Sequence, residues 1–503
     1  MAGGSALALL PRLGHHAVVT DDALPPSTRV PAPSAGRSVP RLGPFTLRAR
    51  ILTPLGSGGT RYLRDGVVTV DPSGRISAVD DHRAWTTAER VAAGGPGGPP
   101  EVVDLRPLLL LPGLVDLHAH LAQLPNAGLG AGLHLLEWLE RYIYPLERAF
   151  DGPAAARLAP AAFERMAALG TTTAVVYGAA WATSMDETFR AAEGHGIRLV
   201  AGRVMMDRIS YRDTPPERRL EVELAESAEL CQRWHGRDAG RLSYAFSPRF
   251  ALSCSEQLLA ASVDLARTTG AYWQTHLSED RNEIAEVASL FPTARDYLDV
   301  YDHIGALGPR TIMAHAIHLS EPEIDRMAET GTRIAHCPES NLFLASGAMR
   351  FARYRDRGLV VGLGSDVAAG PTLSLFSVMR AAAYTHDLLR VTAEADPAAR
   401  LGPIPPVEWL AAATLGGARA LGIDDRIGSI EPGKEADLIA VDPRLAAPLP
   451  DLDVDEPDEL VSRLVFRPHP EMVRAAWVRG RLLPDGRPEG GSAPAGRSGS
   501  SDA

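Results

Sequence analysis

The chain has 503 residues, a formal net charge of -11 and 45% hydrophobic residues, the balance of a large folded protein. The acidic charge argues against a nucleic-acid-binding surface, and the sequence contains no run of about 18 apolar residues that could span a membrane. Three cysteines are too few for a disulfide framework and fit a reducing compartment, so we expect a cytoplasmic protein.

The two ends of the chain are predicted to lack a packed core. Residues 1–44 are rich in Pro, Gly and Ser and show little hydrophobic periodicity, which is typical of a disordered leader. Residues 486–503 have the composition of a flexible tail.

Short alternating runs with turn residues occur near both ends of the remaining chain. They lie at residues 45–54, 66–81, 435–444 and 472–483, and they predict β-strands and hairpins. Because two distant regions share this pattern, we predict one small β-sandwich domain formed by residues 45–107 together with residues 430–485.

The region 108–429 alternates apolar runs with stretches of helical periodicity. We predict eight strands, at residues 108–120, 171–179, 197–207, 242–250, 270–279, 310–320, 332–341 and 359–367. Eight strands separated by helices predict an α/β fold of the (β/α)8 TIM-barrel type. One predicted helix, at residues 132–150, repeats Leu135, Trp138, Leu139 and Tyr142 at helical spacing, and we interpret these side chains as packing against the barrel.

Polar side chains recur where the predicted strands end. Apolar runs lead into His118 and His120, into His276, into His315 and into Asp366. The C-terminal ends of the strands form the active site of a TIM barrel. One histidine there could be a buried core residue, but four strand ends with the same feature are hard to assign to packing.

The spacing of two of these histidines suggests a metal site. His118 and His120 are two residues apart on a strand, so their rings project to the same side. On its own, this pair could equally be two polar residues at the mouth of the barrel that bind no metal. Together with His276 and Asp366 it supplies three nitrogens and one carboxylate oxygen, a ligand set for a catalytic Zn²⁺ or Fe²⁺.

Several segments resemble the amidohydrolase superfamily, whose members pair a metal-binding barrel with a β-sandwich formed by both chain ends. They are PGLVDLHAH, HLSED, MAHAIHLS, HCPESN, GLGSD and GSIEPGKEADL. Within the superfamily, LLEWLERYIYPLERAF and SPRFALSCSE are most similar to the guanine deaminase family. The resemblance covers roughly residues 45 to 480.

The resemblance implies a role for each matching residue. It implies one Zn²⁺ per chain, with Fe²⁺ as the other possibility, and its ligands would be His118, His120, His276 and Asp366. Glu279 would be the proton shuttle, His315 and Asp366 would orient and deprotonate the attacking water, and Gln123, Arg249 and Phe250 would hold a purine. The implied activity is hydrolytic deamination of guanine to xanthine and ammonia, by a homodimer.

Two features narrow the type of metal centre. The only lysine is Lys434, in the C-terminal β segment, so a two-metal centre bridged by a carbamylated lysine from a barrel strand is excluded. The other class of zinc deaminases uses an H-x-E motif followed by P-C-x-x-C. The only H-x-E here is His469-Pro470-Glu471, and no matching cysteine pair exists.

Two alternatives remain open. The first is a mononuclear amidohydrolase that acts on another aminopurine, a pterin or a chlorinated triazine; Gln123 and Arg249 would decide which heterocycle fits. The second is a non-catalytic scaffold on the same fold, but such a protein would be expected to lose metal ligands, and this chain keeps all of them.

Overall fold

The computed structural model describes residues 42–86, 102–392, 402–449, 452 and 454–486. The leader predicted at residues 1–44 and the tail predicted at 486–503 lie outside these ranges, apart from their innermost residues. Within the described ranges, none of the helices is long and apolar enough to cross a bilayer.

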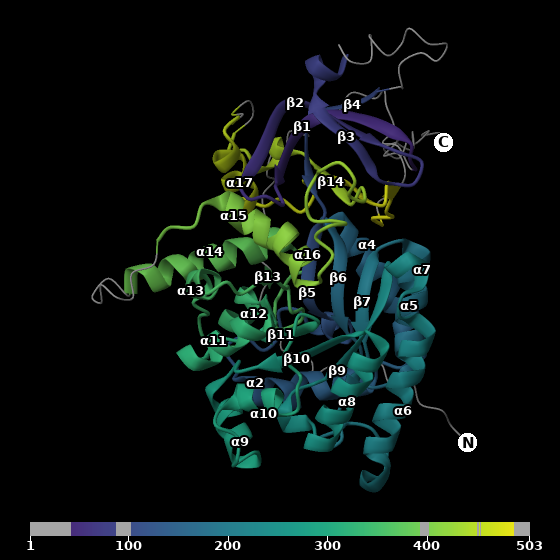
Figure 1. The fold of residues 1–503 in the computed structure, drawn as a ribbon, viewed down its shortest axis with the longest axis vertical. Helices are drawn as coiled ribbons and strands as arrows, with labels where there is room; N and C mark the ends of the chain where they lie inside the picture. The colour runs from purple at the N-terminus through teal and green to yellow at the C-terminus, as the bar shows by residue number, and fades with distance from the viewer. Residues whose placement is uncertain (1–41, 87–101, 393–401, 450–451, 453, 487–503) are drawn as a thin grey trace, which may run out of the picture. The chain divides into compact units, whose positions relative to one another are not determined.

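Eight parallel strands form a closed barrel, which confirms the predicted TIM-barrel fold (Figure 1). They are β5 (Leu114–His120), β6 (Thr171–Tyr177), β7 (Arg198–Gly202), β9 (Leu242–Pro248), β10 (Tyr272–Leu277), β11 (Thr311–His315), β12 (Arg333–His336) and β13 (Val361–Leu363), with the short β8 (Val204–Met205) paired to β9. The barrel closes just after β13, where the N–H of Asp366 donates to the carbonyl of His118 at 2.7 Å and the N–H of His120 donates to the carbonyl of Val367 at 2.9 Å.

Helices surround the barrel strands (Figure 1). They include α4 (Gly152–Ala168), α5 (Ala182–His195), α6 (Pro216–Trp234), α8 (Glu256–Thr269), α9 (Arg281–Leu290), α10 (Tyr297–His303), α11 (Glu321–Thr330), α12 (Pro338–Phe343), α13 (Phe351–Asp356), α14 (Leu375–Thr392) and α15 (Pro406–Ala411). Their ends follow local sequence signals. Asp280 and Glu283 form a capping box at the start of α9, and α8 ends at Gly270, whose φ of 70° suits a residue without a Cβ atom.

The helix predicted at residues 132–150 is present in three parts. It runs as α2 (Leu135–Trp138), the π-helical turn η2 (Leu139–Ile143) and α3 (Tyr144–Arg148). Pro145 offers a physical reason, because its ring has no N–H and crowds the carbonyl four residues earlier. The wider turn relieves this crowding, and the N–H of Tyr144 donates instead to the carbonyl of Leu139.

The two ends of the described chain form one continuous seven-stranded sheet (Figure 1). In sheet order its strands are β16 (Arg481–Leu482), β15 (Val473–Val478), β14 (Leu438–Val441), β4 (Val102–Pro112), β1 (Phe45–Pro54), β2 (Thr60–Val70) and β3 (Ile76–Asp81). An apolar cluster that includes Leu47, Leu110 and Trp477 packs on the sheet. The predicted domain boundary between residues 107 and 108 falls within β4, and β5 of the barrel begins two residues after β4 ends.

A buried charge network joins the barrel to the segment that leads into β14. Arg198, at the start of β7, donates to Glu435 Oε2 at 2.6 Å and to Asp437 Oδ2 at 3.0 Å. Arg426 and Arg479 also donate to Glu435. Burial alone would raise the pKa of Glu435, but these arginines lower it to about 2. The network therefore holds the Glu435 carboxylate in its charged form.

We predict that Arg198→Met destabilises the protein by about 3–5 kcal/mol, because it leaves two buried carboxylates without their shared cation. Unfolding in denaturant, measured as the free energy at constant metal content, checks this value. As a control, Arg64→Met removes a cation that is 64% exposed and pairs with Asp455, and it should cost less than about 1 kcal/mol. Equal costs for the two substitutions would contradict a structural role for the buried network.

Candidate metal centre and substrate pocket

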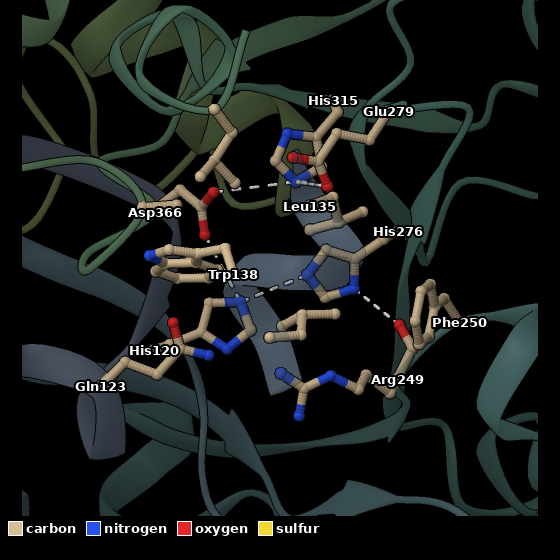
Figure 2. Close-up of a pocket in the computed structure, with 13 residues that line it drawn as sticks. His120, Gln123, Leu135, Trp138, Arg249, Phe250, His276, Glu279, His315 and Asp366 are labelled. Atoms are coloured by element: carbon tan, nitrogen blue, oxygen red, sulfur yellow. Dashed lines mark hydrogen bonds and ion pairs between the residues drawn. The ribbon is translucent and has the colours of Figure 1, made fainter. Parts of the chain in front are cut away.

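Every residue predicted for the site lies at the C-terminal end of the barrel strands, and Figure 2 shows all of them except His118. His118 and His120 end β5, Gln123 lies in the short helix η1 (Leu121–Asn126), Arg249 and Phe250 directly follow β9, His276 lies in β10, Glu279 follows it, His315 ends β11 and Asp366 follows β13. All of them except His118 line one cavity of about 350 Å³.

Four of these side chains converge on one point, as ligands of a single ion would. The Nε2 atom of His120 lies 3.1 Å from that of His118 and 3.2 Å from that of His276. The Oδ1 atom of Asp366 lies 3.2 Å from His118 Nε2 and 3.4 Å from His120 Nε2. Ligands at about 2.0–2.1 Å from a tetrahedral Zn²⁺ are roughly 3.3–3.4 Å apart, so the four atoms fit one such ion.

The protonation states of this cluster also suit a cation. Burial, together with the neighbouring imidazoles, lowers the pKa of His120 and His276 well below the ordinary value. Burial would raise the pKa of Asp366, but His118 and His315 lower it to about 2. His276 Nδ1 lies 2.6 Å from the carbonyl oxygen of Arg249 and donates to it, which leaves the Nε2 lone pair for a metal. Neutral imidazoles and an ionised carboxylate are the forms that bind a divalent ion.

Asp116 holds the loop that carries the carboxylate ligand. Its side chain is fully buried and accepts hydrogen bonds from Ser365 Oγ at 2.6 Å and from the backbone N–H groups of Ser365 and His118 at 2.9 and 3.2 Å. Asp366 itself has a φ of 48°, a left-handed conformation that costs a non-glycine residue about 1–3 kcal/mol. Asp116 thus helps to stabilise a strained backbone at the site. Sequence reasoning missed this role, although a carboxylate within the apolar LVDL run was a signal.

Glu279 and His315 form an acid–base pair beside the ligand cluster. His315 Nε2 lies 3.3 Å from Glu279 Oε2 and 3.8 Å from Asp366 Oδ2. Burial and then the nearby Asp366 raise the pKa of Glu279 well above the ordinary value. His315 Nδ1 donates to Asn341 Oδ1 at 2.9 Å, so Nε2 is the nitrogen that faces Glu279. The sequence-based predictions did not include Asn341.

The opposite side of the pocket carries a second polar group (Figure 2). Arg249 donates from Nη1 to Glu147 Oε2 at 2.6 Å and from Nη2 to Glu147 Oε1 at 3.2 Å. Gln123 Nε2 donates to Glu147 Oε1 at 2.8 Å. The guanidinium also lies over the ring of Tyr144, at 5.2 Å from its centroid. The sequence-based predictions included Gln123 and Arg249 in the site but not Glu147. The available signal was that Glu147 shares a helical face with the buried residues Leu139 and Ile143.

Apolar side chains complete the lining of the cavity. They are Leu135, Trp138, Leu139, Phe250, Leu344 and Ala369. Leu135, Trp138 and Leu139 are buried, as the packing interpretation expected, but they also face the cavity. That interpretation was therefore incomplete. A flat, largely apolar ligand with a polar edge fits such a lining.

Lys434 lies away from this cavity. Its ammonium donates to Ser429 Oγ at 2.5 Å and lies 3.4 Å from Glu431. Because it is the only lysine of the chain, no lysine is available to bridge two metals in the barrel.

Comparisons with known proteins agree with this geometry. Residues 109–483 match the sequence profile of the Amidohydrolase family. Guanine deaminase of Escherichia coli (strain K12) is 39% identical over 72% of this chain and 79% of its own length.

Two solved structures are similar along most of the chain. The guanine deaminase from C. acetobutylicum with bound guanine in the active site is 27% identical, with a TM-score of 0.78 over 87% of this chain and 99% of its own. An adenosine deaminase from Xanthomonas campestris with bound zinc is 29% identical, with a TM-score of 0.73 over 88% and 93% of the two chains. Because the family profile spans well over half of a chain that has the family's barrel and a four-ligand cluster at its strand ends, this chain belongs to the amidohydrolase family.

Proposed function

We propose that this protein is a zinc-dependent guanine deaminase that hydrolyses guanine to xanthine and ammonia. The observation that carries the proposal is the pairing of two polar groups across one small cavity. A four-ligand cluster with Glu279 lies on one side, and Arg249 with Gln123 lies on the other. The similarity to guanine deaminases, one of them solved with bound guanine, supports the choice of substrate.

The residues that would hold the metal are His118, His120, His276 and Asp366. A bound zinc ion lowers the pKa of a coordinated water to about 7 and so supplies a nucleophile at neutral pH. One such centre per chain is proposed, because the two groups of possible ligands, His118 with His120 and His276 and His118 with His315 and Asp366, share His118, and because the only lysine is Lys434.

Glu279 would carry the protons of the reaction. Its carboxyl group is buried, has a raised pKa and lies beside His315. In the proposed reaction, water oxygen adds to C2 of guanine, and Glu279 takes the water proton and delivers it to a ring nitrogen. The new C2 hydroxyl then gives its proton through Glu279 to the amino group, the C2–N bond breaks as the C2=O bond forms, and the amine leaves as ammonia. His315 and Asp366 would orient the attacking water.

Arg249 and Gln123 would bind the edge of the purine that lies away from C2. Arg249 offers N–H donors to O6 and N7, while Phe250 and Trp138 supply apolar contacts with the ring. The structural similarity to an adenosine deaminase makes a related aminopurine the second candidate substrate. The donors of Arg249 favour guanine, because adenine carries an amino donor at the position of O6.

We predict about one zinc ion per chain, and we expect His276→Ala to lose both the metal and the activity, because one of four ligands is removed. Elemental analysis of purified protein and variant, with ammonia release measured in parallel, checks both statements. Two tightly held metals per active chain would contradict the mononuclear centre.

We predict that Glu279→Gln keeps its zinc and loses about 10²–10⁴-fold in turnover, because glutamine preserves the shape of the side chain but cannot transfer a proton. The measurement is kcat on guanine for samples of equal zinc content. Near-normal turnover in the zinc-loaded variant would rule out Glu279 as the proton shuttle.

We predict that the zinc-loaded protein releases ammonia from guanine and not from adenine. Adenine faces the donor-only guanidinium with another donor, and it has no amino group at C2. Arg249→Ala should impair guanine turnover and retain zinc, and Arg249→Lys should restore little, because an ammonium lacks the planar fork. A panel of guanine, adenine, cytosine and aminotriazines tests this, and robust turnover of adenine would refute the assignment.

A further inference from the structure

Gln123 and Arg249 form the polar wall of the cavity. Glu147 lies directly behind this wall. Its side chain is 1% exposed and does not line the cavity, whereas both Gln123 and Arg249 do. Its two oxygens accept three hydrogen bonds, two from Arg249 and one from Gln123. The hydroxyl of Tyr211 interacts with the same carboxylate. Any effect of Glu147 on a ligand must therefore act through Gln123 and Arg249.

The carboxylate determines which end of the Gln123 amide faces the ligand. The two ends of a glutamine amide have nearly the same shape, but one donates and the other accepts. A carboxylate only accepts, so the NH₂ group of Gln123 must face Glu147. The amide oxygen then remains for the cavity, and within the described part of the chain it has no hydrogen-bond partner.

Glu147 also fixes the neighbouring cation. It holds both terminal nitrogens of Arg249 in a fork, and it balances the charge of a side chain that is only 4% exposed. Arg249 has five N–H groups, so donors remain for a ligand. The wall therefore presents an acceptor from Gln123 next to donors from Arg249, with no net charge from the Arg249–Glu147 pair.

We propose that Glu147 is the positioning residue that determines substrate specificity, because it makes this wall complementary to a lactam edge. A lactam such as O6 and N1–H of guanine presents an acceptor beside a donor. The amidine edge of adenine presents the reverse order, a donor at the 6-amino group and an acceptor at N1. The proposal rests on the proposed function and adds the residue that decides between the two edges.

Hypoxanthine and adenine form the matched probe pair, because they differ at this edge and both lack the 2-amino group. Binding of each is measured on the zinc-loaded full chain. We expect the wild type to bind hypoxanthine about 5–150-fold more tightly than adenine. This ratio of affinities corresponds to the roughly 1–3 kcal/mol of a good bidentate pair. Glu147→Gln should bring this ratio close to one while zinc stays, because its amide can pair with either orientation of Gln123. Glu147→Asp keeps the charge but is one methylene shorter, so we expect an intermediate ratio.

A matched control separates specificity from general loss of a buried charge. Glu223 pairs with Arg203 at 2.9 Å, both are buried, and neither lines the cavity. Glu223→Gln should lower stability and leave the ligand ratio unchanged. If both Glu147 variants fail to fold, the same measurement on Gln123→Met tests the inference with Glu147 in place. The preference of this variant for hypoxanthine over adenine must then be smaller than that of the wild type.

The outcomes distinguish this inference from the proposed function. A wild type without preference for hypoxanthine overturns the inference, as does an unchanged ratio in a folded Glu147 variant or in Gln123→Met. A wild type that prefers hypoxanthine, loses this preference in Glu147→Gln and yet does not deaminate guanine overturns the proposed function alone.

Discussion

The seam between β5 and β13 is the constraint on which the site depends. Backbone hydrogen bonds join Asp366 to His118 and His120 to Val367, and the side chain of Asp116 ties both strand ends together. This closure brings a carboxylate to within 3.2–3.4 Å of two imidazole nitrogens. Lone pairs that converge so closely in a buried place repel one another unless a cation lies between them. Closing the barrel and bringing these candidate metal ligands together are therefore one structural event.

The two sides of the cavity use burial in opposite ways. On the side of the candidate metal ligands, burial raises the pKa of Glu279 and lowers that of His276. On the other side, two hydrogen bonds from the Arg249 guanidinium hold the side chain of Glu147 in a bidentate pair. In the proposed function, proton transfer would thus use a group whose pKa is shifted, whereas recognition would use groups whose hydrogen-bonding pattern is fixed.

Much of this arrangement could be predicted from the sequence because barrel strands carry their own signal. An apolar run ends in each of His118, His276, His315 and Asp366. Each run predicts a barrel strand, and it also predicts which side of the barrel its last residue faces. The residues that support these groups gave a weaker signal. Glu147 is 102 residues away from Arg249, and Asn341 meets His315 only because α12 follows β12. Such partners are defined by tertiary packing, which local periodicity does not reveal. The π turn likewise could not be predicted from the sequence, because its cause, Pro145, is equally compatible with the first turn of a separate helix.

The segment from α2 to α3 couples two requirements of the proposed chemistry. Its first part supplies Leu135 and Trp138, which cover the cavity, and its last part supplies Glu147 behind the polar wall. Apolar cover excludes water, and electrostatic interactions are stronger where water is excluded. The fork between Glu147 and Arg249 is therefore strongest when the cover is in place. A helix of regular pitch through residues 132–150 would turn Glu147 away from the direction that the π turn gives it. The local widening at η2 thus sets cover and recognition group together, which explains why an irregular turn lies beside this pocket.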